Sequence, residues 1–301
     1  MKKIKKLALL LAICMVVEVM SLYKSFGKNK VLEDVNFSLD EGKIYALVGR
    51  NGSGKTTLLK IMADIYQKDL GKINIFGKSF KEDKHIIENI AYLPDRFDYF
   101  DYSSVEKMLG YYEVIYPNFD KRFVLKELEK NNIDIKKNLR SFSKGYKNLI
   151  GLLAVIGTNA KIVLLDEILD GMDVLNKEII LSYILDLKDF GRSVLASSHE
   201  LEELAKVADE TLYLSKNGKL TNLQKNKEKF VKLQIVVKDE LDPKILDRAV
   251  LRFKLGRVYT ILIENRENLM DMIKNNESVV QFDILDPKIE DNFYWEKGRS
   301  K

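Results

Sequence analysis

The sequence contains little cysteine, little net charge and no long hydrophobic run in its main part. Cys14 is the only cysteine among 301 residues, so no disulfide can form within the chain, which fits a reducing compartment. After residue 20 no hydrophobic stretch is long enough for a transmembrane helix, so we expect any membrane-spanning part to belong to another chain. The 50 Lys and Arg residues nearly balance the 45 Asp and Glu residues and are scattered, which does not indicate nucleic-acid binding. The net charge of +5 is compatible with a position beside an anionic membrane surface.

The first 15 residues read as an N-terminal extension. Residues 1–6 are basic and 7–17 are apolar, an order that resembles a secretory signal, but the apolar run is too short to span a bilayer. Because residues 16–19 already have the pattern of a strand, we favour a cytosolic protein whose natural start is Met15. An amphipathic anchor lying on a membrane surface is the alternative.

Residues 49–57 carry a phosphate-binding loop. They fit the pattern G-x-x-x-x-G-K-[ST] and follow an apolar run, 44–48, that is typical of a buried strand. Glycines let backbone N–H groups surround an anion, and the helix that begins at Lys55 points its positive end at the same place. We expect Lys55 to reach the β- and γ-phosphates of a nucleotide and the Thr56 hydroxyl to hold Mg²⁺. The nucleotide-binding residues predicted from this pattern are Gly49, Arg50, Asn51, Gly52, Ser53, Gly54, Lys55, Thr56 and Thr57.

The apolar pattern predicts a parallel α/β core with an inserted helical lobe. Predicted strands lie within 31–48, with a turn at 41–43, and at 71–79, 89–94, 161–166 and 193–197; predicted helices lie at 55–66, 174–187 and 200–207. Two further helices fill 103–132 and break at Pro117, so the helical lobe is placed at about 96–150.

The chain is expected to divide near residue 222. The polar, lysine-rich stretch 223–229 reads as a linker that follows an ATPase domain at 16–222. Segments 230–237, 250–263, 268–274 and 278–284, which alternate strands with short helices, then predict a small C-terminal α+β accessory domain over 223–301. This domain contains no histidine, no cysteine and no motif with assignable chemistry, so packing, dimerisation or regulation is its expected role.

Two carboxylates follow the apolar run 162–165. Burial of this strand places Asp166 and Glu167 at the carboxyl edge of the sheet, beside the phosphate loop. We expect Asp166 to hold Mg²⁺ through water and Glu167 to polarise the water that attacks the γ-phosphorus. An apolar run before Asp-Glu is often only a strand end, but the preceding phosphate loop favours the metal-binding interpretation.

His199 follows another apolar strand, 193–198, and is the one of the two histidines that lies at a sheet edge. A histidine there can donate a hydrogen bond to the γ-phosphate while Glu167 orients the attacking water. The alternative is a surface histidine at the start of a helix. His85 lies in a charged loop and receives no role.

In order and spacing, these motifs resemble those of ABC-type ATPases, and the segment 142–146 decides the subclass. The family's segment is Leu-Ser-Gly-Gly-Gln, in which Ser143 and Gly145 match and Phe142, Lys144 and Tyr146 differ. The resemblance covers residues 16 to about 220. It implies a P-loop NTPase fold of the ABC type, with an antiparallel β-subdomain and an inserted helical lobe.

The resemblance also implies a role for this capping segment, residues 142–146. In the family it covers the γ-phosphate bound to the phosphate loop of a second, head-to-tail subunit. Ser143 and Gly145 would supply a hydroxyl and a bare backbone amide at a helix start, and Lys144 would add positive charge toward the phosphate. By itself a Ser-x-Gly helix cap is common.

Other positions are assigned by the same resemblance. Phe26 stands where the family stacks an aromatic ring on adenine, and Asp173 fits the carboxylate that contacts the opposing subunit. Asp95 takes the place of a glutamine that senses Mg²⁺ and the transport partner, and a carboxylate there can still reach the metal. Ile168 stands where the family usually has proline.

The implied function is that of a motor subunit of an ABC transporter that binds and hydrolyses ATP. It would dimerise head-to-tail with a second ATP-binding subunit, the same or different, and drive a separate integral-membrane permease from the cytoplasmic side of the cell membrane. A single ATPase half with an α+β tail resembles exporters of the bacitracin, lantibiotic or ABC-2 type.

Aromatic residues between 92 and 102 are a candidate docking surface, with local core packing as the alternative. A soluble ABC ATPase and an ATP sensor with slow turnover are the competing hypotheses, and the sequence encodes no pocket for a transported substrate.

Overall fold

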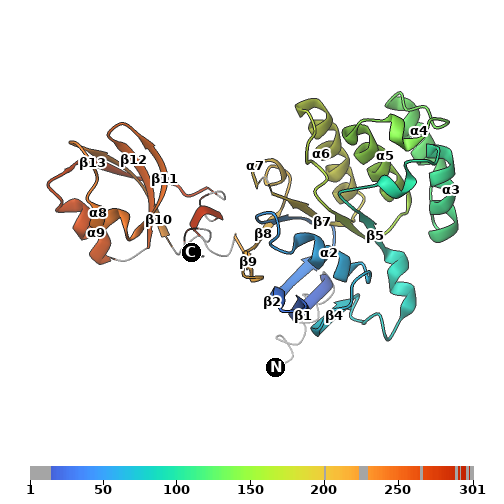
Figure 1. Cartoon of the computed structure of the whole chain (residues 1–301), viewed down its shortest axis with the longest axis horizontal. Coiled ribbons are helices and arrows are strands. Elements are labelled where there is room, and N and C mark those ends of the chain that lie inside the picture. Colours follow the sequence, from blue (N-terminus) through green and yellow to red (C-terminus); the bar gives the residue numbers. More distant parts are fainter. Residues whose placement is uncertain are drawn as a thin grey trace, which may run out of the picture. The chain divides into compact units, whose positions relative to one another are not determined.

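The computed structural model describes residues 15–199, 201–223, 230–264, 267–288, 291, 293–295 and 298 (Figure 1). The chain divides into two compact units, Met1–Leu220 and Thr221–Lys301. The expected N-terminal extension lies outside the described residues except for Met15, where β1 begins, and most of the expected linker, residues 224–229, lies outside them too. No described helix combines the length and the apolar character needed to cross a membrane.

A six-stranded sheet forms the centre of the first unit, in the order β5-β6-β7-β3-β8-β9. The strands are β3 (Ile44–Val48), β5 (Ile90–Leu93), β6 (Ile162–Leu165), β7 (Ser193–Ser198), β8 (Glu210–Leu214) and β9 (Leu220–Asn222). The pairs β5–β6, β6–β7, β7–β3 and β3–β8 are parallel. Every residue of β3, β6 and β7 is buried, as expected for parallel strands covered on both faces, so polar side chains can gather only at the strand ends.

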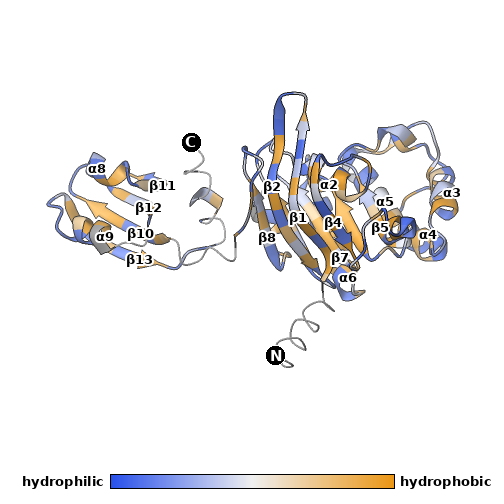
Figure 2. Cartoon of the chain, turned by 90° about the horizontal axis from the view of Figure 1, so that it is seen from below, coloured by the Kyte–Doolittle hydropathy of each residue, from blue (hydrophilic) through white to orange (hydrophobic). Residues whose placement is uncertain are grey.

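A second sheet of the first unit is antiparallel, in the order β2-β1-β4, and confirms the predicted β-subdomain. Its strands are β1 (Met15–Phe26), β2 (Asn29–Asp40) and β4 (Leu70–Ile75). Hydrophilic and hydrophobic residues alternate along β2, as Figure 2 shows, because one side of the sheet faces the core. One hydrophobic cluster joins this sheet to α2 (Lys55–Met62) and to the parallel sheet, through residues such as Leu39, Leu59 and Leu195.

The inserted lobe is helical, as predicted. It contains the 3-10 turn η2 (Asp98–Phe100), α3 (Val105–Ile115), α4 (Lys121–Lys130), the turn η3 (Leu139–Ser141) and α5 (Lys144–Gly157). Side chains of Ser104, Asp120 and Ser143 each cap a helix by accepting a hydrogen bond from the backbone. A further turn, η1 (Lys84–Asn89), precedes β5, while α6 (Val174–Asp189) and α7 (Leu201–Leu204) lie after β6 and β7.

The second unit is an antiparallel sheet in the order β11-β12-β10-β13, with two helices. Its elements are β10 (Phe230–Val237), α8 (Pro243–Leu246), β11 (Ala249–Leu255), β12 (Val258–Glu264), α9 (Glu267–Lys274) and β13 (Val279–Leu285). Leu233, Ile261 and Ile273 belong to one core that joins the sheet to α9. The sequence predicted a single element over 250–263, but Gly256, at a φ of +54°, turns the chain so that β11 and β12 form a hairpin.

Two helical glycines of the lobe give a matched test of its packing. A Cβ added to Gly157 would lie 2.8 Å from a ring carbon of Phe119 and against Val124, whereas one added to Gly110 would meet nothing within 4 Å. We therefore expect Gly157→Ala to lower the free energy of unfolding by about 1–3 kcal/mol, because the core must move apart. Gly110→Ala should raise it by about 0.5–1 kcal/mol, because alanine favours the helix. Urea denaturation measures both, and a stabilising Gly157→Ala would contradict the close packing of α4 against α5.

Candidate functional site

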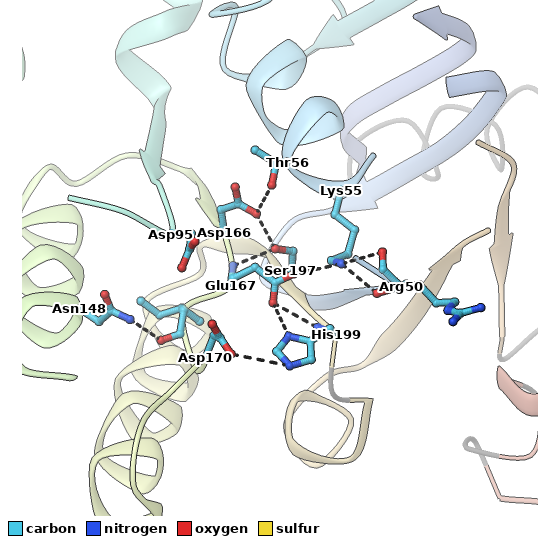
Figure 3. A network of polar contacts seen from close by, with 12 residues as sticks. Arg50, Lys55, Thr56, Asp95, Asn148, Asp166, Glu167, Asp170, Ser197 and His199 are labelled. Carbon is cyan, nitrogen blue, oxygen red and sulfur yellow. Dashed lines mark hydrogen bonds and ion pairs between the residues drawn. The ribbon is translucent and has the colours of Figure 1, made fainter. Parts of the chain in front are cut away.

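A pocket of ≈ 500 Å³ lies at the carboxyl ends of the parallel strands, and most of the predicted site residues line it. Figure 3 shows the polar contacts among Lys55, Thr56, Asp166, Glu167 and His199. The side chains come from the loop between β3 and α2, from the segments after β5, β6 and β7, and from the tip of the β1–β2 hairpin. The lining residues are Phe26, Val31, Asn51, Gly52, Gly54, Lys55, Thr56, Thr57, Asp95, Glu167, Asp170 and His199.

The phosphate loop has the backbone geometry of an anion cradle. Gly54 has a φ of +105° and begins α2 without any side-chain cap, so the first N–H groups of the helix point into the loop. A Cβ on Gly54 would lie 2.8 Å from Val31, so only glycine fits there. The buried hydroxyl of Ser53 has no hydrogen-bond partner among the described residues. A buried polar atom without a partner is costly, and the loop therefore fits a phosphate group.

Lys55 is the buried cation of this site. Its ammonium donates a hydrogen bond to the carbonyl oxygen of Gly49 at 2.8 Å and forms an ion pair with Glu167 Oε1 at 3.0 Å. The side chain is only 4% exposed, so this pair lies in a medium of low dielectric constant. Lys55 thus joins the phosphate loop to the carboxylate that follows β6.

Asp166 is held by three hydroxyl groups. Thr56 and Ser197 donate to its Oδ1 at 3.1 and 2.8 Å, and Tyr92 donates to its Oδ2 at 3.2 Å. Burial raises the pKa of Asp166, while the three hydrogen bonds oppose that rise by favouring the charged form. Burial and the charge of Asp166 together raise the pKa of Tyr92, so the phenol stays a proton donor.

Glu167 and His199 form the next contact. Nδ1 of His199 lies 3.0 Å from Glu167 Oε2, and the backbone N–H of His199 donates to the same oxygen at 3.2 Å. Glu167 has a φ of +48°, an uncommon backbone conformation for a residue other than glycine, and its N–H donates to Ser197 Oγ at 2.9 Å. Nε2 of His199 lies 3.7 Å from Asp170, so the histidine stands between two carboxylates.

The capping segment lies at the start of α5 and outside the pocket wall of its own chain. Ser143 and Lys144 are exposed and Gly145 is buried. Lys144 forms ion pairs with Asp95 at 3.0 Å and Asp170 at 3.1 Å. Burial lowers the pKa of Lys144, but these two carboxylates outweigh that effect and raise the pKa overall.

The other predicted positions are placed as follows. Phe26 is half exposed at the pocket rim and packs edge-on against Tyr66. Asp95 lines the pocket, but its contact is with Lys144.

Asp173 caps α6 through a hydrogen bond from Asn176 N and does not line the pocket. Ile168 is buried, and its carbonyl accepts from Asn148, which holds the turn after Glu167. Gly49, Arg50 and Ser53 belong to the loop but not to the lining residues.

A magnesium ion at this site would take oxygen ligands, which the site offers. Thr56 supplies a hydroxyl and Asp166 a carboxylate that already lie 3.1 Å apart. In the part of the chain that the structure describes, no cluster of three or more His, Cys, Asp or Glu side chains could hold a metal by itself. The residues therefore fit an ion that shares its ligands with phosphate oxygens and water.

Sequence reasoning did not assign Ser197, Tyr92 or Asp170 to the site. Ser197 and Tyr92 reach Asp166 from β7 and β5, the two strands that flank β6. The small polar residues at the end of 193–198 indicate a possible polar site. Only the strand order, in which β7 lies beside β6, shows that Ser197 reaches Asp166. Asp170 lies in a loop, and the sequence contained no sign of its contact with Lys144.

Comparison with known proteins identifies the family. A family model described as ABC transporter matches residues 32–170. The ABC transporter ATP-binding protein YtrB of Bacillus subtilis is 30% identical over 252 residues, which cover 82% of this chain and 86% of YtrB. The chain belongs to the family of ABC transporter ATP-binding proteins. The lantibiotic transport ATP-binding protein SrtF of Streptococcus pyogenes is 32% identical over 64% of this chain and 83% of its own length. A solved ATP-binding subunit of an ABC transporter superposes with a TM-score of 0.63 at 25% identity, over 70% of this chain and 92% of that one. The predicted fold of an ABC-type ATPase is thereby confirmed.

Replacing Ser197 tests how firmly Asp166 is held. Ser197→Ala removes the buried hydrogen bond to Asp166 and the part-buried acceptor for Glu167 N, so we expect it to lower the free energy of unfolding by about 1–3 kcal/mol. As control, Ser182→Ala removes an exposed hydroxyl that bonds only within α6 and should change stability by less than about 0.5 kcal/mol. Urea denaturation measures both; equal small effects would mean that Ser197 does not hold the site.

The same variant should show a pH dependence of known sign. Because the folded-state pKa of Asp166 is raised, its favourable contribution to stability is present at low pH and is lost as the pH rises through that pKa. Ser197 donates to the charged form, so the loss caused by Ser197→Ala should be larger at neutral pH than at the lowest pH at which both proteins remain folded. A loss independent of pH would assign the effect to packing alone.

Proposed function

We propose that this protein is the ATP-hydrolysing motor subunit of an ABC transporter that works with a separate membrane permease. Binding and hydrolysis of ATP are general to the family. The single observation that carries the proposal for this chain is the convergence of Lys55, Thr56, Asp166, Glu167 and His199 on one edge of the parallel sheet.

The residues at the pocket support a role in triphosphate binding. The uncapped start of α2 and the unpartnered Ser53 hydroxyl suit phosphate oxygens. Phe26, at the rim, offers a ring on which adenine can stack. Lys55, which pairs with Glu167 and lines the pocket, would neutralise phosphate charge. Thr56 and Asp166 would hold Mg²⁺, which when bound supplies charge neutralisation between the phosphates.

Glu167 is the proposed general base, and His199 positions it. Both carboxylate oxygens are engaged, Oε1 by Lys55 and Oε2 by His199, so the side chain has one fixed direction. A carboxylate held in this way can orient a water molecule and accept its proton. If Lys55 turns toward a phosphate group, Oε1 of Glu167 becomes available to that water.

A second copy, or a related subunit, is proposed to complete the site. Ser143, Gly145 and Asp173 do not line the pocket of their own chain, and Ser143 and Asp173 are exposed. The start of α5 could therefore meet the phosphates of a head-to-tail partner. Hydrolysis would remove the charge that joins the two chains, and the opening and closing would be the mechanical output.

The helical lobe is the proposed contact with the permease. Phe97 is buried against Tyr99 and Phe100, so part of the predicted aromatic surface is local core. Tyr92 bonds to Asp166, whereas Tyr99 and Tyr102 are exposed. With the exposed Tyr111, Val114 and Ile115 they form a patch on and before α3. Such a patch suits a partner at the membrane, which would place the protein on the cytoplasmic side. The name of SrtF, which refers to lantibiotic transport, supports a transport role, and we propose export as its direction.

A second candidate is an ATP sensor with slow turnover. The observation in its favour is the ion pair of Lys55 with Glu167, because it occupies one of the two carboxylate oxygens that could orient an attacking water. The third possibility, a soluble ABC ATPase without a permease, would be supported by co-purification with ribosomes instead of a polytopic membrane protein.

Glu167→Gln separates the first two candidates. We expect the variant to lose ATPase activity by about 100-fold or more, because the amide cannot accept the proton, and to remain as an ATP-bound dimer. Size-exclusion chromatography with ATP and steady-state phosphate release measure the two effects. Glu129→Gln, an exposed change on α4, is the control and should match the wild type. A monomeric Glu167→Gln variant would contradict the motor mechanism, and equal low rates in variant and wild type would favour the sensor.

A further inference from the structure

Lys144 contacts two carboxylates in the wall of the pocket of its own chain. Its Nζ lies 3.0 Å from Asp95 Oδ1 and 3.1 Å from Asp170 Oδ2, and both aspartates line the pocket although Lys144 does not. The three side chains are 37–41% exposed, so solvent can reach the pairs and salt can screen them. The contacts join the start of α5 to the segments that follow β5 and β6.

The side chains that line the pocket carry more negative than positive charge. Among the described residues that line it, Asp95, Glu167 and Asp170 carry negative charge, and Lys55 is the only lysine or arginine. Lys55 is already paired with Glu167. Asp95 and Asp170 would therefore repel a bound triphosphate unless another cation offset them. Lys144 is the cation in contact with both.

We propose that Lys144 is a positioning residue for the nucleotide site of its own subunit: it offsets Asp95 and Asp170 and fixes the loops that carry them. This inference rests on the proposed nucleotide binding, and it changes the expected role of Lys144. In the sequence-based interpretation its charge points toward the phosphates of a second subunit. Here the ammonium is held within its own chain, so its effect precedes and does not require dimerisation.

The proposal is tested on the full chain by titration with a fluorescent, non-hydrolysable ATP analogue, at concentrations where sedimentation shows a monomer. Lys144→Gln should weaken binding about three- to fivefold, the size expected for two partly exposed pairs. In an Asp95→Asn background the same change should weaken binding by less than about twofold, because one of the two repelling charges is gone. Lys144→Arg should restore binding, since it keeps the charge.

Three controls make the result specific. Lys126→Gln, an exposed change on α4 of the same lobe, should leave the affinity at the wild-type value. The effect of Lys144→Gln should shrink at high salt, where exposed charges are screened, whereas a packing defect would not respond to salt. Lys55→Ala should abolish binding under all conditions, because it removes the cation of the phosphate loop.

The outcomes are distinguishable. Unchanged monomer affinity in Lys144→Gln, with ATP-dependent dimerisation impaired, would overturn the inference and assign Lys144 to the partner's site. Equal effects of Lys144→Gln with and without Asp95 would overturn it as well. Wild-type affinity in Lys55→Ala would count against the proposed nucleotide site itself.

Discussion

The buried carboxylate of Asp166 is the contact on which the arrangement of the pocket depends. It receives hydroxyl groups from α2, β7 and β5, and so it ties the phosphate-loop helix to the three strands around it. The ionised form of a carboxylate at 1% exposure is costly unless such donors surround it. The parallel strands cannot accept polar groups along their length, so these donors lie where the strands end. The proposed magnesium site and the packing of these elements therefore depend on the same few bonds.

A series of polar contacts continues from this point around the pocket. Lys55 pairs with Glu167, Glu167 contacts His199, His199 lies near Asp170, and Asp170 pairs with Lys144. Each group holds its neighbour in a fixed direction, as the proposed proton transfer at Glu167 would require. A bound phosphate would have to compete with the Glu167 carboxylate for the ammonium group of Lys55. This competition links nucleotide binding to the release of the proposed base.

The sequence predicted the elements and the phosphate loop well, because both depend on local patterns. Continuous apolar runs gave β3, β6 and β7, and glycines at fixed spacing gave the loop and the start of α2. The contacts between elements could not be predicted from local sequence patterns. Ser197 reaches Asp166 only because β7 lies next to β6, and Lys144 reaches Asp95 across 49 positions of the sequence. The hairpin of β11 and β12 was missed because apolar residues continue on both sides of Gly256.

The pair of Asp95 and Lys144 shows how departures from a family pattern are best judged. Taken singly, a carboxylate in place of glutamine adds a repelling charge to a phosphate site, and a lysine in place of glycine crowds a helix start. Their side chains lie 3.0 Å apart, so each change offsets the electrostatic effect of the other. Asp170 leaves Lys144 one carboxylate to offset where Asp95 is absent, since Asp170 also lines the pocket. The electrostatic effect of a substitution at Asp95, Lys144 or Asp170 therefore depends on the charges of the other two, and under the proposal nucleotide affinity would follow their sum.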